Sequence, residues 1–168
     1  EIAKAAEFAI GTLYKFFKNK EDLYKALIIG LSEKFHTTLT AAVETTEDEI
    51  VKLRSYVKAK GIVFMENISF IRLYFAETRG ASFNIKAGFD REILERYYKF
   101  MHILASIFES GIRKKMFQKI ADPYHLAVAL DSLCNAYLSL WMEWPEEHPY
   151  PQDPDVILNI LFNGLLDA

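Results

Sequence analysis

The chain has 168 residues, and its 20 lysines and arginines against 23 aspartates and glutamates give a formal net charge of −3 at pH 7. This balance argues against a protein that is coated in nucleic acid, although it allows a local basic patch. Hydrophobic residues make up 51% and aromatic residues 14% of the chain, which is enough for a large core or cavity in one or two domains.

Cysteine content and hydropathy both bear on the compartment. Cys134 is the single cysteine, so an intramolecular disulfide framework is excluded, and a lone thiol suits a reducing environment. Apolar runs in the sequence stay below the roughly 18 residues that a membrane-spanning helix needs. These features predict a cytoplasmic protein without a membrane partner.

The first 27 residues are expected to form two short helices and the start of a third. Residues 2–6 form the first helix, the chain breaks at residues 7–9, and the second helix begins near Ile10. The apolar side of the second helix has i, i+3, i+4 spacing and consists of Leu13, Phe16 and Phe17. Its polar and basic side consists of Thr12, Tyr14, Lys15 and Lys18. This pattern predicts a helix-turn-helix, and Asn19 is the expected N-cap of the third helix.

The spacing I-A-x-x-A-x-x-x-x-G-T-L-Y-x-x-F-x-x-K-x-x-L resembles the DNA-binding signature of the TetR family of transcriptional regulators. The positions that carry it are Ile2, Ala3, Ala6, Gly11, Thr12, Leu13, Tyr14, Phe17, Lys20 and Leu23. A short motif such as G-T-L-Y is weak evidence by itself, whereas this many positions at fixed spacing are a strong signal.

The resemblance implies a recognition helix that contacts operator DNA. The residues that it places at the DNA are Ala9, Ile10, Gly11, Thr12, Tyr14, Lys15, Lys18 and Lys20. It implies that Thr12 and Tyr14 bind phosphates and that Lys20 anchors the DNA backbone. Of the side chains that can reach base edges, Lys15 can donate to guanine and Ile10 can contact a thymine methyl group. The alternative is an ordinary amphipathic helix pair with solvated lysines.

Two residues in the turn depart from the family pattern. Glu7 stands where the family usually has glycine, and Ala9 stands where it often has a serine or threonine cap. The family's first helix also has no counterpart before Glu1, so we expect an incomplete N-terminus. These departures keep a helical carrier that does not use DNA as an alternative.

The rest of the chain is expected to be helical, which makes the fold class all-α. One helix runs from residue 19 toward residue 45 and joins the head to the remainder of the chain. A capping box, with Thr46 as N-cap and Glu49 at N3, begins the next helix, which continues to Phe75. Gly61 either bends that helix or leaves room beside it. A connection is expected at residues 78–88.

Three further helices complete the expected fold. The first, residues 90–115, ends in a basic run at residues 113–115, which is interpreted as a solvated helix end rather than a second DNA contact. Asp122 and Pro123 begin the next helix, which ends near residue 144. After an acidic loop, Asp153 and Pro154 begin the last helix, which continues through residue 166. The predicted domains are a partial helix-turn-helix head, residues 1–27, and a ligand-binding and dimerisation domain, residues 28–168.

Aromatic side chains are dense in the middle helices and lie on more than one face. An apolar cavity with a few polar groups is the usual form of a small-molecule site, and the resemblance also implies such a pocket. The predicted lining consists of Phe64, Ile68, Phe75, Tyr97, Met101, Leu104, Phe108, Tyr137 and Trp141. Polar tips that can orient a ligand are Glu66, Asn67, Arg72, Tyr97, His102 and Asn135. The alternative is a well-packed core.

The last two helices carry apolar stripes that suit self-association. The predicted dimer interface consists of Leu126, Leu130, Leu133, Leu140, Ile157, Leu161 and Leu165. The resemblance implies a four-helix interface at this place, and a two-fold homodimer would read a near-palindromic operator. The alternative is that these stripes are buried within one chain.

Catalytic and metal-binding patterns are not found in the sequence. Its four histidines are isolated and it has one cysteine, so no metal-ligand spacing appears. The phosphate-loop, dinucleotide and nucleophile-elbow motifs are also missing. Cys134 lies between Leu133 and Asn135 in a predicted helix and is interpreted as a packing residue. We therefore expect a protein that is not an enzyme and uses no metal or cofactor.

The function that these features predict is a homodimeric, ligand-responsive transcriptional regulator. It would act as a repressor that a small apolar or aromatic effector releases from its operator. The first alternative is a helical small-molecule-binding dimer without DNA-binding activity. The second is an enzyme built on the aromatic cavity.

Overall fold

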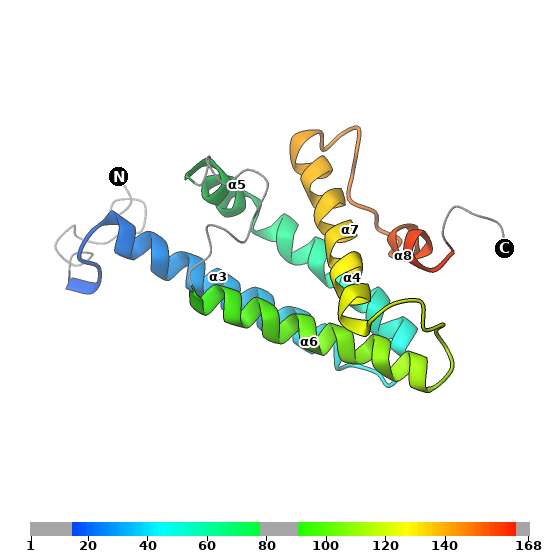
Figure 1. Ribbon diagram of the computed structural model, residues 1–168. Helices are drawn as coiled ribbons and strands as arrows, with labels where there is room; N and C mark the ends of the chain where they lie inside the picture. Colours follow the sequence, from blue (N-terminus) through cyan, green and yellow to red (C-terminus); the bar gives the residue numbers. More distant parts are fainter. Residues whose placement is uncertain (1–14, 78–90, 164–168) are drawn as a thin grey trace. The chain divides into compact units, whose positions relative to one another are not determined.

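Figure 1 shows the protein as a computed structural model that describes residues 15–77 and 91–163, with the backbone alone described at residue 21 and at residues 73–77. The helices are α3 (Lys20–Val43), α4 (Glu49–Glu66), α5 (Ile68–Glu77), α6 (Arg91–Arg113), α7 (Pro123–Glu143) and α8 (Asp155–Phe162). Within those ranges the chain forms helices and no strand, so the prediction of an all-α fold is confirmed. The expected connection at residues 78–88 and the expected last turn at residues 164–166 lie outside the described ranges.

The chain consists of two compact units, Glu1–Lys34 and Phe35–Ala168, and α3 runs through the boundary between them. The larger unit contains the last third of α3 and all of α4 to α8. Within it, α6 packs against α7, both contact α4, and α8 contacts α4 and α7. None of the helices described here is both long and apolar enough to cross a membrane.

Helix N-termini follow the predicted caps at two places. The side-chain oxygen of Asn19 accepts a hydrogen bond from the backbone N–H of Asp22 at 2.7 Å, and Asp22 accepts one from the backbone N–H of Lys18 at 3.1 Å. At α7, Asp122 accepts from the backbone N–H of Tyr124 at 2.9 Å, and Pro123 occupies the first helical position. Both arrangements satisfy N–H groups that have no acceptor inside the helix.

The predicted capping box at α4 is wrong. The N-cap is Asp48, whose Oδ1 accepts from the backbone N–H of Val51 at 2.9 Å. The Thr46 hydroxyl instead accepts from the backbone N–H of Asp48 at 3.2 Å, two residues along the chain. This shift frees Glu49 from the cap, and its carboxylate is buried against α6. At α8, Asp153 accepts from the backbone N–H of Asp155 at 2.9 Å, but the helix begins at Asp155 and its N-cap is Pro154, one residue after the predicted cap.

The helix that was predicted to run unbroken to Phe75 is interrupted at Asn67, which separates α4 from α5. The side-chain Nδ2 of Asn67 donates to the backbone oxygen of Val63 at 2.6 Å. In a continuous helix that oxygen would accept the backbone N–H of residue 67, which here bonds to the oxygen of Phe64 at 3.2 Å. The asparagine side chain thus replaces its own backbone, as short polar side chains often do at helix ends.

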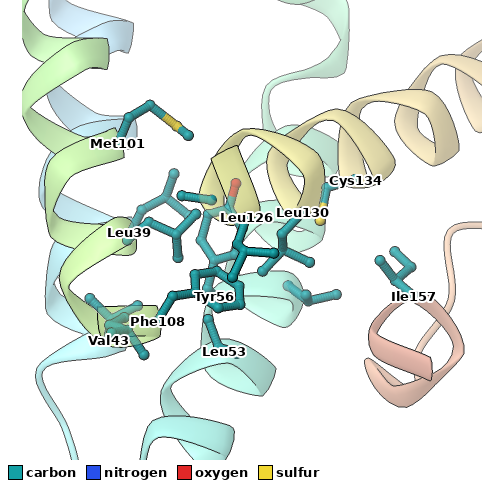
Figure 2. Close-up of a cluster of buried hydrophobic side chains, with 14 of the residues drawn as sticks. Leu39, Val43, Leu53, Tyr56, Met101, Phe108, Leu126, Leu130, Cys134 and Ile157 are labelled. Carbon is teal, nitrogen blue, oxygen red and sulfur yellow. The ribbon is translucent and has the colours of Figure 1, made fainter. Parts of the chain in front are cut away.

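The main core cluster of the larger unit draws on α3, α4, α6, α7 and α8. Figure 2 shows Leu39 and Val43 of α3 and Tyr56 of α4 beside Phe108 of α6 and Leu130 of α7. These side chains are all less than a tenth exposed. Their burial is the main force that holds the helices together, at about 25 cal/mol per Å² of apolar surface.

Gly61 leaves room for a ring rather than bending α4. A Cβ atom at Gly61 would overlap the ring of Tyr150, a buried residue in the loop between α7 and α8. The Tyr150 hydroxyl donates to the backbone oxygen of Val57 at 2.9 Å, which fixes the loop on α4. Gly111 plays the same part in α6, where its missing side chain is replaced by the ring of Phe117.

Candidate functional site

The basic residues of the predicted DNA-binding head are exposed where the structure describes them. Lys15, Lys18 and Lys20 are all exposed, and Asn19 between them caps α3. The other residues assigned to DNA, Ala9, Ile10, Gly11, Thr12 and Tyr14, lie outside the described ranges. The described part of the head therefore offers a short cationic surface at the start of α3, as a phosphate contact requires.

A cluster of polar side chains lies inside the larger unit, and we call it the Asp131 cluster. Asp131 of α7 is 5% exposed and accepts from the hydroxyl of Tyr56 at 2.6 Å and from that of Tyr97 at 3.0 Å. Lys60 donates to Oδ1 of the same carboxylate, and Asn135 donates to Oδ2 at 3.0 Å. The cluster thus links α4, α6 and α7 through one carboxylate that has four donors.

The hydrogen bonds keep Asp131 charged in spite of its burial. Burial alone raises the pKa of this carboxyl, but the charge of Lys60 and the bonds from Lys60, Tyr56 and Tyr97 outweigh it, so the pKa lies below its usual value. Burial, followed by the charge of Asp131, raises the pKa of both Tyr56 and Tyr97. The tyrosines therefore remain neutral donors at any physiological pH.

The sequence predicts only part of this cluster. Tyr97 and Asn135 are among the predicted polar tips, whereas Lys60, Tyr56 and Asp131 are not. A signal was present in α7, because Asp131 stands in the buried stripe formed by Ala127, Leu130, Cys134 and Leu138. A charged residue at a core position of a helix normally has a buried partner, so this position could have been marked as functional or paired.

The residues predicted to line a pocket fall into two groups. Met101, Leu104 and Phe108 are at most 1% exposed and belong to the core, so their surfaces are already covered by their own chain. The others are half-buried, and all of them except Ile68 pack against that core; they are Phe64, Ile68, Tyr97, Tyr137 and Trp141. The side chain of Phe75 is not among those described. The core alternative therefore accounts for the first group in this structure.

The residues predicted to form a dimer interface also divide. Leu126, Leu130 and Ile157 are at most 8% exposed, so their own chain already buries them, as the alternative expects. Leu133 and Leu161 are half-buried, Leu140 is 39% exposed, and Leu165 lies outside the described ranges. Periodicity alone could not tell these faces apart, because both sides of α7 carry leucines at steps of three and four.

The basic end of α6 proves to hold a structural ion pair. Lys114 donates to Oε1 of Glu49 at 2.7 Å, and the hydroxyl of Ser110 donates to the same oxygen at 2.7 Å. These bonds from Lys114 and Ser110 lower the pKa of Glu49 from 4.5 to about 2. The interpretation of residues 113–115 as a solvated helix end is therefore wrong for Lys114, which joins the start of α4 to the end of α6.

Among the described residues, no three histidine, cysteine or acidic side chains lie close enough together to hold a metal ion. Cys134 is fully buried beside Tyr150, and burial raises the pKa of its thiol. A protonated, buried thiol is a poor nucleophile, which fits its interpretation as a packing residue.

Known proteins match the chain both in the N-terminal motif and over most of its length. The family described as "Bacterial regulatory proteins, tetR family" matches residues 1–27. The uncharacterized HTH-type transcriptional regulator YhgD of Bacillus subtilis (strain 168) is 27% identical over 171 residues, which cover 95% of this chain and 79% of that protein.

Two solved structures share the fold over nearly the whole chain. The transcriptional regulator FadR of Bacillus subtilis, solved with stearoyl-CoA, is 19% identical with a TM-score of 0.76, covering 98% of this chain and 87% of FadR. The fatty acid degradation regulator FadR of Bacillus halodurans is 18% identical with a TM-score of 0.74 and covers the same shares, 98% and 87%. Regulators of this family bind operator DNA and small-molecule effectors and form dimers. Residues 1–27 thus match the tetR family of regulatory proteins, and over nearly its whole length the chain is similar in sequence to one transcriptional regulator and in fold to others.

Proposed function

We propose that the protein is a cytoplasmic homodimeric repressor that an apolar acyl compound releases from a near-palindromic operator. The observation that carries this proposal is the joint occurrence of the family match at residues 1–27 and the FadR-like fold over the rest. A second copy is needed because one recognition helix reads only half of a symmetric site.

Operator contacts are assigned to the eight residues of the head that the sequence predicts. Exposure of Lys15, Lys18 and Lys20 supports the assignment for these three. Lys20 and the hydroxyls of Thr12 and Tyr14 would bind phosphates, which gives affinity without sequence preference, whereas Ile10 and Lys15 would select bases.

The effector class is inferred from apolar surface and from one relative. FadR of Bacillus subtilis was solved with stearoyl-CoA, which has a long apolar chain and a polar end. In this chain, Phe64, Tyr97, Tyr137 and Trp141 are half-buried at the border of the core, where an acyl chain could displace protein contacts at small cost. The buried residues Met101, Leu104 and Phe108 would be reached only if α6 and α7 separate.

The proposed dimer surface is the outward face of α7 and α8. It carries Leu140, Trp144, Val156 and Ile160, each between 39% and 49% exposed, together with the half-buried Leu133 and Leu161. These residues recur at helical spacing on two helices that contact one another, so they form adjoining apolar stripes that a second copy can cover.

The test is fluorescence anisotropy on labelled duplex from the protein's own upstream region, across a salt series and with added stearoyl-CoA. We expect sequence-selective binding with a steep salt slope and release by the acyl compound. Lys20→Ala should weaken binding to all duplexes and reduce the salt slope by about one, while Lys15→Ala should change the preference among sites. Equal, weak binding to scrambled duplex would support the helical dimer that does not use DNA.

A further inference from the structure

The members of the Asp131 cluster differ in burial. Asp131 is 5% and Tyr56 is 0% exposed, whereas Lys60, Tyr97 and Asn135 are only half-buried. Each of these three half-buried members donates a hydrogen bond to the carboxylate. The members of the cluster that keep some exposure are therefore hydrogen-bond donors, and the carboxylate is the more deeply buried group.

Because the partly exposed members of the cluster are hydrogen-bond donors, a ligand that binds them must carry a hydrogen-bond acceptor. A carbonyl, carboxylate or phosphate oxygen can accept from the Lys60 ammonium and the Tyr97 hydroxyl, whereas a protonated amine cannot. Such an oxygen would compete with Asp131, because the Tyr97 hydroxyl has a single proton to donate. Each donor that moves to the ligand leaves the buried carboxylate less well satisfied, and a buried charge with too few donors is unstable.

The cluster is also in contact with α3 through a short series of rings. The ring centroid of Tyr56 lies 5.5 Å from that of Phe100 on α6, and Phe100 lies 6.2 Å from the ring of His36 on α3 in an edge-to-face arrangement. About one and two turns beyond His36, Leu39 and Val43 of α3 enter the same core. Because a close-packed interior cannot yield at one point without moving its neighbours, displacement of Tyr56 must be felt by α3.

We propose that the Asp131 cluster is the regulatory site of the larger unit, and that a ligand with an acceptor oxygen disrupts its hydrogen bonds. The ligand oxygen takes the hydrogen bonds of Tyr97 and Lys60, the Asp131 carboxylate loses donors, and Tyr56 and Phe100 shift against α3. The inference deepens the proposed function and rests on it for the effector, but the link between the cluster and α3 can be tested without effector or DNA.

The first experiment measures amide hydrogen exchange at residues 35–43 of α3 in the free protein. We expect Tyr97→Phe and Asp131→Asn to accelerate exchange there by about tenfold or more beyond what their change in global stability explains. The matched control is Tyr150→Phe, which also removes a buried tyrosine hydroxyl, the donor to Val57, but lies outside the cluster. If amide exchange at residues 35–43 is as fast in the control as in the two cluster variants, the cluster does not control α3 and the proposal is wrong.

The second experiment tests the ligand chemistry by calorimetry. Wild-type protein should bind stearoyl-CoA and stearic acid but not octadecylamine, and Tyr97→Phe should weaken stearoyl-CoA binding by about tenfold. Equal affinity of wild type and Tyr97→Phe would contradict the role of the cluster in binding. If wild type binds none of these probes, the proposed effector class is wrong, and the exchange experiment still decides whether the cluster controls α3.

Discussion

Two of the ion pairs that helix α4 makes differ sharply in burial. On its inner face, Lys60 pairs with Asp131 of α7, and the two side chains are 13% and 6% exposed. On its outer edge, Arg54 pairs with Asp155 of α8, with side chains that are 45% and 36% exposed. The outer pair has the better fork geometry, with bonds of 2.7 and 3.0 Å from two guanidinium nitrogens.

Burial, rather than bond geometry, determines how much depends on each pair. Water can replace either partner at the outer edge, so the loss of Arg54 leaves Asp155 solvated. Asp131 is 5% exposed, so the loss of Lys60 leaves a carboxylate in the core with neutral donors only. Four changes, ordered from the largest expected effect to the smallest, test this contrast along α4.

Removal of Lys60 should be the most damaging change. We expect Lys60→Met to lower the free energy of unfolding by about 3–5 kcal/mol, the usual result when one member of a buried pair is removed. Urea denaturation measures this effect. The double variant Lys60→Met/Asp131→Leu should recover part of the loss, because it removes the unpaired charge as well. A single variant as stable as wild type would show that the pair is not needed for stability.

A methyl group at Gly61 should come next. Gly61→Ala places a Cβ atom in the ring of Tyr150, and overpacking of this kind typically costs about 1–3 kcal/mol. Gly30→Ala is the matched control, because no atom lies within 4 Å of the Cβ that it adds, and alanine favours a helix over glycine by up to about 1 kcal/mol. The melting temperature should therefore fall in Gly61→Ala and rise in Gly30→Ala. A rise in both variants would contradict the close approach of Tyr150.

Acid should weaken the Glu49–Lys114 pair, whose burial is intermediate between those of the other two pairs. Its carboxylate is buried and its partner Lys114 is half exposed, with side chains 3% and 47% exposed. Because the folded pKa of about 2 lies below the usual 4.5, the pair stabilises the fold fully above pH 4.5 and loses that contribution as the pH falls toward 2. Thermal melts from pH 6 to pH 2 should show a smaller slope in Glu49→Gln than in wild type over this window.

The smallest effect is expected at the outer edge. Arg54→Met should leave the melting temperature almost unchanged, and high salt should abolish any difference that remains, because exposed charges are screened. Scanning calorimetry of wild type and variant at low and high salt measures both. A loss as large as that of Lys60→Met would mean that α8 depends on this pair, and the contrast along α4 would fail.

Local sequence determined the helical fold class, the caps of α3 and α7 and the motif in the head. Asn19 and Asp122 cap α3 and α7 as predicted, since a cap needs only a side chain and an N–H two or three residues away. The motif in residues 1–27 was equally readable, because its spacing lies within one short segment.

Only the tertiary structure decided which helix faces are inside and which polar groups meet. Lys60 and Asp131 are 71 residues apart, and no local pattern pairs them. Leu130 and Leu140 occur in the same apolar repeat, yet the first is 0% and the second 39% exposed. Helix periodicity requires contacts only within about one turn, whereas burial and long-range pairing depend on how all the helices pack, and the sequence pattern of one helix does not contain that information.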